Sequence, residues 1–294
     1  MHLRTRGSPL LTHTVLSFVA ALVFLIFTSS TSGQSATDSE SASVSETSGE
    51  SSEDLLKAAE NPVADLFSIP IQNTTNFNIG PYRRTQNVVT LEPIIPLSLS
   101  ENWMLVSRII QPIIWQPYPD QRAGGVSGLG DMTPSSFITP GNPRSMIWGV
   151  GAATVIPVAT SNVLGQGKLS LGPSAVLLAQ PGHWTVGALV SNVWSIAGSG
   201  GRPPVNRMAL EYFMSYNLPH EWYLTSSPTI TADWRASPGN VWTLPIGVGV
   251  GKLVNFRDKV VDFSGAFYRN AKTPAAMPTW SMSLQATLLL PKQK

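Results

Sequence analysis

The chain has 294 residues, of which 12% are charged, with 24 Gly, 24 Pro and no Cys. The formal net charge of +2 is too small to predict nucleic-acid binding, and the lack of Cys excludes disulfides and thiolate metal sites. Charged residues are about half as frequent as in an average soluble domain, while the hydrophobic content of 43% is ordinary. A transmembrane β-barrel has this profile, because lipid-facing residues alternate with polar ones.

The N-terminal 72 residues divide into three segments. Residues 1–33 are predicted to be a cleaved secretory signal, since Arg4 and Arg6 precede an apolar core from Val15 to Phe27 and a run of small residues. That core is shorter than the roughly 20 residues that a membrane anchor needs. Residues 34–54 are rich in Ser and Glu and are predicted to be disordered. Residues 55–72 are predicted to be a short helical or irregular periplasmic segment.

From residue 73 to 292 the sequence alternates with a period of two, which predicts strands. In the clearest case Trp184, Val186, Val190 and Trp194 share one face, and Thr185, Gly187, Ser191 and Ser195 share the other. We expect about twelve strands, near 73–80, 86–97, 102–115, 127–139, 145–158, 168–180, 182–197, 206–218, 220–234, 241–253, 260–270 and 278–290. The predicted fold is all-β, a transmembrane antiparallel up-and-down β-barrel.

The connections between these strands alternate between two classes. Short ones lie at 98–101, 140–144, 181–182, 219–220 and 255–259, and longer ones at 116–126, 159–167, 198–205, 235–240 and 271–277. Barrels of the outer membrane have short periplasmic turns and longer outer loops. The alternation therefore favours an even number of strands with both ends periplasmic.

Seven prolines oppose the strand assignment, because a proline has no N–H for the ladder. They are Pro93, Pro96, Pro112, Pro157, Pro173, Pro228 and Pro245. We expect several of them at bulges or strand ends.

An ordered series of short segments resembles a known bacterial family. The series includes Asn61-Pro-Val-Ala-Asp65, Pro93-Ile-Ile-Pro-Leu97, Gly128-Leu-Gly-Asp131, Trp148-Gly-Val-Gly151 and Leu288-Leu-Leu-Pro-Lys292. Over residues 60–292 the chain resembles the outer-membrane proteins labelled neuromedin U, which are grouped with the transporter-like family of the phenol meta-cleavage pathway. The resemblance implies an outer-membrane channel or uptake pore, and it carries no functional residues. The chain departs from many such barrels in lacking a C-terminal aromatic residue.

The charged residues of the strand region are the candidate lumen residues. They are Glu92, Arg108, Asp131, Arg207, Glu211, Asp233, Asp262 and Arg269. An Arg or Lys on the lipid face near the midplane costs about 2–4 kcal/mol, so these charges are expected inside. They form either a selectivity ladder along an open pore or a set of ion pairs that fills and closes a small barrel. Arg108 and Arg269 are both candidate partners for Glu211.

Tryptophans near strand ends are predicted to form the two interfacial belts of a membrane barrel. The candidates are Trp103, Trp148, Trp184, Trp194, Trp222, Trp242 and Trp280. A stacking path for sugars or arenes is the alternative.

Catalysis and metal binding have little support in the sequence. Only His183 and His220 follow the signal segment, each beside a short turn. A lipid hydrolase would need Ser191 or Ser195 beside His183 with an orienting group. No His pair has ligand spacing, and no glycine-rich loop precedes a helix, so neither a metal nor a cofactor is expected.

The predicted protein is a barrel in the outer membrane of a Gram-negative bacterium, and it passes small molecules, hydrophobic or aromatic ones included, without a cofactor. Its expected partners are outer-membrane lipid, the barrel-assembly machinery and an unidentified small solute, with no nucleic acid. The alternatives are a closed docking barrel that acts through its outer loops, a membrane lipid hydrolase and a soluble β-sandwich.

Overall fold

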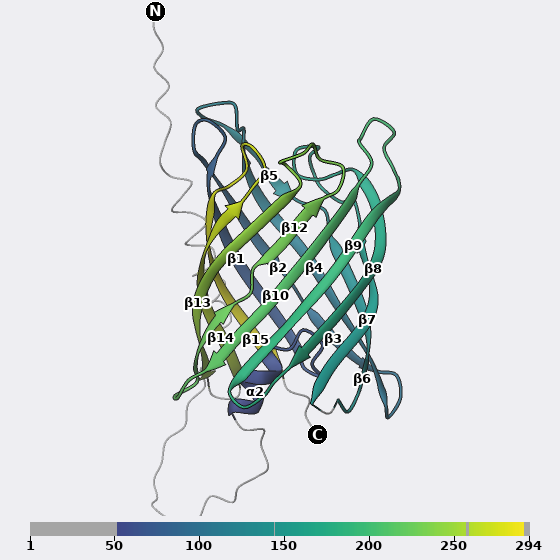
Figure 1. Cartoon of the computed structure of the whole chain (residues 1–294), viewed down its shortest axis with the longest axis vertical. Helices are drawn as coiled ribbons and strands as arrows, with labels where there is room; N and C mark the ends of the chain where they lie inside the picture. The colour runs from purple at the N-terminus through teal and green to yellow at the C-terminus, as the bar shows by residue number, and fades with distance from the viewer. Residues whose placement is uncertain (1–51, 144, 257–258, 291–294) are drawn as a thin grey trace, which may run out of the picture. The chain divides into compact units, whose positions relative to one another are not determined.

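A computed structural model describes residues 52–143, 145–256 and 259–290. The predicted signal segment and most of the predicted disordered tract lie outside the described residues. The described chain forms one closed antiparallel β-barrel of twelve spans (Figure 1), which confirms the predicted fold class. Three of the twelve spans are each made of two strands, so that fifteen strands are distinguished.

The strands follow one another around the barrel in chain order. They are β1 (Phe67–Ile79), β2 (Arg84–Leu91) with β3 (Ile94–Ser98), β4 (Trp103–Pro117), β5 (Gly125–Leu129) with β6 (Thr133–Pro140), β7 (Met146–Val155), β8 (Lys168–Ala179), β9 (Trp184–Gly198), β10 (Asn206–Asn217), β11 (Trp222–Ser226) with β12 (Thr229–Asp233), β13 (Trp242–Phe256), β14 (Lys259–Lys272) and β15 (Trp280–Leu290). The barrel closes because β1 pairs with β15 over eleven residue pairs, from Phe67↔Leu290 to Phe77↔Trp280.

Two boundaries at the N-terminal side differ from the sequence prediction. Strand β1 begins at Phe67, six residues before the predicted start at residue 73. Helix α2 (Ser52–Ala59) begins inside the tract predicted to be disordered up to residue 54. The alternation of apolar and polar residues did not predict the start of β1 at Phe67, because it is interrupted by Gln72, Asn73, Thr74 and Thr75.

Prolines lie in two of the three gaps that divide a span into two strands. Pro93 lies in the gap between β2 and β3, and Pro228 lies in the gap between β11 and β12. Pro245 stands at a register shift between β13 and β14, and Pro157 lies beyond the end of β7. Pro96, Pro112 and Pro173 lie within strands. A missing N–H is thus placed mostly where the ladder is already interrupted.

The outer face of the barrel is apolar between two aromatic belts. Near the short turns Trp103 contacts Trp148 edge-on, with 6.0 Å between ring centroids, and Trp184 packs against Tyr216 at 4.8 Å. Near the longer loops Trp280 stacks on Phe77 at 3.7 Å. The belt tryptophans that were predicted therefore lie on two levels, with Trp222 on the first and Trp194 and Trp242 on the second.

The inner face carries the small and polar partners of the alternation. Gly247, Gly249 and Gly251 of β13 face inward, where the ring of Tyr223 lies against Gly251 and that of Tyr268 against Gly247. A side chain at either glycine would overlap the tyrosine ring. Glycine here lets large side chains of neighbouring strands fill a narrow lumen.

Candidate functional site

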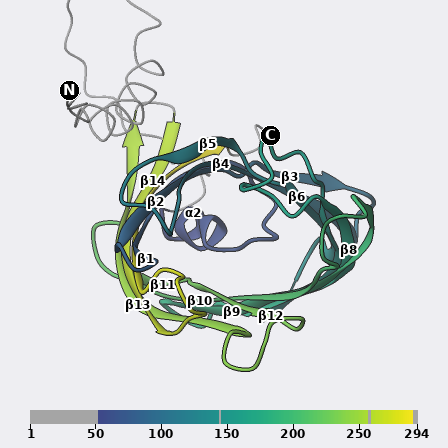
Figure 2. The ribbon, with the colours of Figure 1, turned by 90° about the horizontal axis from the view of Figure 1, so that it is seen from above.

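The lumen is the candidate site. Its short-turn end holds the segment that precedes β1, from α2 to Leu66, which is called the docked segment below. Figure 2 shows α2 inside the ring of strands. Leu56 of α2 and Leu66 are 3% and 5% exposed, and both pack into a cluster with Leu253 of β13 and Leu289 of β15. No helix in the described ranges is long and apolar enough to cross a membrane. The amphipathic helix instead buries its apolar face against the inner wall.

A carboxyl group lies within this docked segment. The carboxyl oxygens of Glu60 are buried inside the barrel. Burial raises the pKa of Glu60 from 4.5 to about 7, against the opposing influence of the Thr185 and Ser215 hydroxyls on the wall, and the charge of Asp262 adds to the rise. The segment is therefore held in place by apolar packing while it carries a carboxyl group that is poorly solvated when ionised.

An apolar layer lies next to the docked segment and spans the lumen. In this layer Val63, which belongs to the docked segment, packs in one buried cluster with side chains from β4, β6, β8, β9 and β10. The wall residues of this cluster are Met104, Val106, Phe137, Val176, Leu178, Leu189 and Phe213. Phe137 and Val106 are fully buried. Side chains that would line an open pore are here packed against one another, as in the interior of a soluble domain.

A buried ion triad crosses the lumen beyond the apolar layer. The guanidinium of Arg108 on β4 donates from Nη1 to Oε2 of Glu211 on β10 at 2.9 Å, and from Nε to Glu92. The side chains of Arg108, Glu92 and Glu211 are 12%, 18% and 25% exposed. Strands β4 and β10 lie almost opposite each other around the barrel, so the Arg108–Glu211 contact joins two walls.

Amide side chains line the lumen around and above this triad. Gln72 donates to Gln285 at 3.0 Å, and Asn76 donates to Gln86 at 2.8 Å. Gln86 in turn donates to Gln116 of β4. Each amide offers both donors and acceptors without charge, so this stretch can solvate water or a small polar solute.

The remaining predicted lumen residues occupy separate places. Arg207 pairs with Asp233 at 3.0 Å near the long-loop ends of β10 and β12, where their side chains are 50% and 32% exposed. Asp262 is buried beside the docked segment and accepts hydrogen bonds from the Tyr223 hydroxyl at 2.8 and 2.9 Å.

Asp131 binds the backbone of the loop that follows β7. Its carboxylate accepts the backbone N–H groups of Gln166 at 2.6 Å and Ala159 at 3.3 Å. Arg202 from the next long loop donates to the Gln166 and Asn162 carbonyls, each at 3.0 Å. These contacts tie two of the longer loops together, so Asp131 fixes a loop and does not join the triad.

The lumen assignment of Arg269 was wrong. In the ladders Arg269 stands opposite Ile246 and Trp280, which are outward-facing, and its side chain is exposed. It shares its face with Phe267, as the period of two requires. The penalty for a lipid-facing charge falls to about 0–1 kcal/mol near an interface, and Arg269 lies near the long-loop end of β14.

The residues of the hydrolase alternative do not come together. His183 precedes β9 at the short-turn end, and its ring lies edge-on to Tyr216 with 6.2 Å between centroids. Ser191 lies eight residues further along, on the inner face. At about 3.3 Å per strand residue the two are roughly 26 Å apart, which is too far for a nucleophile and its base.

Two parts of the site were not predicted from the sequence: the position of the docked segment in the lumen, and the amide side chains that line the lumen. These amides have a sequence signal, because Gln72, Asn76 and Gln86 stand at even positions, two or more residues apart, in a stretch rich in Asn, Gln and Thr. The docked segment has only its local pattern, which predicts a helix and not its position.

No family model and no curated protein matches the chain. Among solved structures, an outer membrane channel from Pseudomonas putida F1 aligns with a TM-score of 0.57 at 14% identity, over 76% of this chain and 94% of that one. The CymD monoaromatic hydrocarbon channel aligns with a TM-score of 0.43 at 10% identity, covering 78% and 88%. Outer membrane phospholipase A from Escherichia coli gives 0.43 at 12%, covering 78% and 90%. At these identities the likeness to the first concerns the fold, and the phenol-pathway family stays a prediction.

Proposed function

We propose that the chain is a gated channel of the bacterial outer membrane, held in a closed conformation in this structure. The observation that carries the proposal is the Arg108–Glu211 contact across the lumen. It divides an amide-lined stretch from the short-turn end, where the segment around α2 is docked. Opening requires that the triad separates and that the docked segment leaves. The similar fold of the channel from Pseudomonas putida F1 supports this proposal.

The solute would be small and would pass by diffusion. Amide groups solvate polar solutes without trapping them, because they carry no net charge to bind an ion strongly. The triad contains two carboxylates and one guanidinium, so its separation exposes a net negative charge. The open channel should therefore favour cations and neutral molecules over anions.

Single-channel conductance in planar bilayers tests the proposal. The wild-type chain should be mostly silent with rare openings, and Arg108→Gln should raise the open probability because two unpaired carboxylates then repel across the lumen. Removing one partner of a buried ion pair costs about 3–5 kcal/mol, so heat-modifiable migration on a gel must show that the variant is folded. Glu211→Gln is a milder variant that keeps the Arg108–Glu92 pair.

Arg207→Gln is the matched control, because it removes an Arg–carboxylate pair of the same barrel that is half exposed at the rim. It should leave the open probability unchanged. A wild-type chain that conducts steadily, with a level that Arg108→Gln does not change, would show that the triad does not close the lumen.

A second candidate function is a closed docking barrel that acts through its long loops. The buried apolar layer around Phe137 favours it, because that packing stabilises a filled lumen. Silence from folded Arg108→Gln and Glu211→Gln variants alike would favour the docking barrel over the channel.

A further inference from the structure

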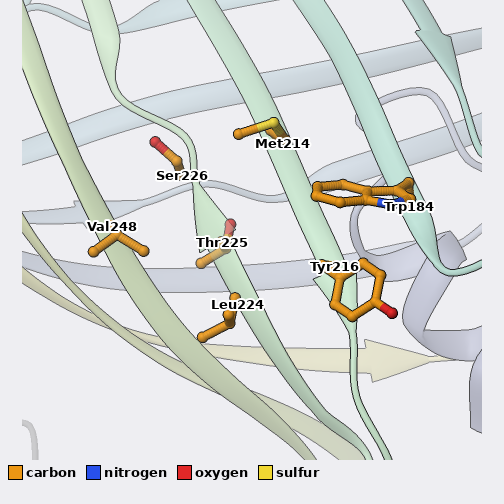
Figure 3. A pocket seen from close by; sticks show the side chains of 7 residues that line it. All are labelled: Trp184, Met214, Tyr216, Leu224, Thr225, Ser226 and Val248. Carbon is orange, nitrogen blue, oxygen red and sulfur yellow. The ribbon is translucent and has the colours of Figure 1, made fainter.

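An apolar groove lies on the outer face of the barrel, next to the short-turn aromatic belt. Trp184 of β9 and Tyr216 of β10 lie on one side of it, and Leu224 of β11 and Val248 of β13 lie on the other, with Met214 between them (Figure 3). The groove encloses about 280 Å³. Trp184, Met214, Leu224 and Val248 are exposed large apolar residues of the membrane-facing surface.

The groove exists because the barrel wall is interrupted at this place. Strand β11 pairs with β13 only from Trp222↔Lys252 to Thr225↔Gly249. Strand β12 pairs with β13 only at Thr231↔Thr243 and Ala232↔Trp242. In the gap stands Pro228, which has no N–H to offer.

Side-chain hydrogen bonds replace the missing ladder. The Ser226 hydroxyl donates to the Gly247 carbonyl at 2.7 Å, and the backbone N–H of Ser227 donates to the Tyr268 hydroxyl at 3.2 Å. The polar backbone at the bottom of the groove is therefore largely satisfied. What the groove offers a ligand is its apolar walls, which suits a hydrocarbon chain.

A cation lies just beyond the groove, on the side of the short turns. Lys252 faces outward opposite Trp222, and its Nζ lies 5.1 Å from the centroid of the Trp222 ring. Lys252 is four residues from Val248 on the same face of β13, about 13 Å along the strand. The positive charge is thus at interface depth, two ladder positions or about 7 Å beyond the lining residue Leu224. From Leu224 the groove runs toward the middle of the membrane.

We propose that this groove binds an anionic phospholipid of the leaflet at the short-turn end. The phosphate of this lipid pairs with Lys252. One of its acyl chains lies in the groove, with Trp184 and Tyr216 on one side and Leu224 and Val248 on the other. A single basic residue at a membrane surface favours an anionic over a zwitterionic lipid by about fivefold. The inference rests on the transmembrane fold and stands whether or not the barrel conducts.

Quenching of tryptophan by brominated acyl chains tests the proposal. The full chain is placed in vesicles that contain either dibromo-phosphatidylglycerol or dibromo-phosphatidylethanolamine at the same mole fraction. The emission of Trp184 is the difference between the wild type and Trp184→Phe. We expect dibromo-phosphatidylglycerol to quench the emission of Trp184 about fivefold more effectively than dibromo-phosphatidylethanolamine at low mole fraction.

Two further variants and one control assign the effect. Lys252→Gln should abolish the difference between the two lipids, and Lys252→Arg should keep it. Trp194 on the same strand faces outward near the other belt, so the emission lost in Trp194→Phe should be quenched equally by both lipids. Val248→Phe should fill the groove without adding a tryptophan, and it should lower the quenching of Trp184 by both lipids.

The proposal is overturned if both lipids quench Trp184 equally in the wild type, which would indicate ordinary annular lipid. It is also overturned if Lys252→Gln keeps the preference. Lys252 is on the outer surface and outside the packed lumen, so Lys252→Gln should fold even if Val248→Phe does not.

Discussion

Single residues decide whether the lumen can be filled, and Gly251 is the sharpest example. A Cβ atom at Gly251 would lie 2.1 Å from the ring of Tyr223, whose hydroxyl donates to Asp262. The tyrosine is 4% exposed and packs against the docked segment. The absence of one side chain on β13 therefore permits the packing that holds α2.

Gly251→Ala should destabilise the barrel by about 2 kcal/mol, because overpacking forces a buried ring out of its position. The measurement is equilibrium unfolding in denaturant from lipid vesicles. Gly200→Ala is the matched control, since a Cβ there would have no atom within 4 Å. Equal unfolding free energies for the two variants would contradict the close packing of Tyr223 on Gly251.

Residue-scale patterns also limited the sequence prediction. The inward direction of Arg108 and Glu211 follows from the period of two, but their contact joins residues 103 positions apart on nearly opposite walls. No local pattern specifies which walls of a barrel approach each other. Arg269 shows the converse. Its parity with Phe267 predicts the outer face, whereas the general cost of a charge in lipid predicts the lumen.

At the scale of elements, the proposed gate requires release of the segment from α2 to Leu66. Its Glu60 carboxyl has a pKa raised from 4.5 to about 7 by burial. Below about pH 4.5 this group is protonated whether the segment is docked or released, so docking carries no penalty. As the pH rises toward 7 the released carboxyl ionises while the docked one stays neutral, and docking weakens.

The open probability should therefore increase between about pH 5 and pH 8 and then level off. The shift of the Glu60 pKa corresponds to about 3 kcal/mol of docking free energy. Single-channel recording at several pH values measures it. Glu60→Gln should stay closed over the whole range, because an amide cannot ionise. A Glu60→Gln chain with the wild-type pH profile would show that another group controls docking.

Tethering the segment should lock the channel. The Gln180 side chain donates to the Lys57 carbonyl at 2.7 Å, and the chain has no Cys of its own. Lys57→Cys combined with Gln180→Cys can thus be joined selectively by a short bifunctional thiol reagent. The cross-linked double variant should remain closed at pH 8. Either single variant treated with the same reagent should still open at pH 8. Persistent pH-dependent opening after complete cross-linking would exclude release of this segment as the gate.

The number and order of the barrel spans were the features that the sequence predicted best. The alternation of residues 184–196 and the alternation of short and long connections led to twelve spans and an even-numbered barrel. Both signals are local, so they survive without knowledge of contacts. The position of α2 is not local, because its apolar face would fit a membrane surface, a partner or the lumen equally well.

At the scale of the whole molecule, the two aromatic belts define the depth of the barrel in the membrane. On β9 the belts are marked by Trp184 and Trp194, and Val190 lies between them on the same face with 40% exposure. Ile196 lies beyond Trp194 and is 61% exposed. One strand thus presents two outward positions of similar chemistry at two different depths.

Val190→Arg should lower the unfolding free energy from vesicles by about 2–4 kcal/mol, and Ile196→Arg by about 0–1 kcal/mol, because the cost of a lipid-facing charge depends on depth. Both substitutions add the same side chain to the same face of β9, so strand propensity and lumen packing cancel in the comparison. A soluble barrel or sandwich would show similar small effects at both positions. Unequal costs in this order are expected only where hydrocarbon covers the band between the belts.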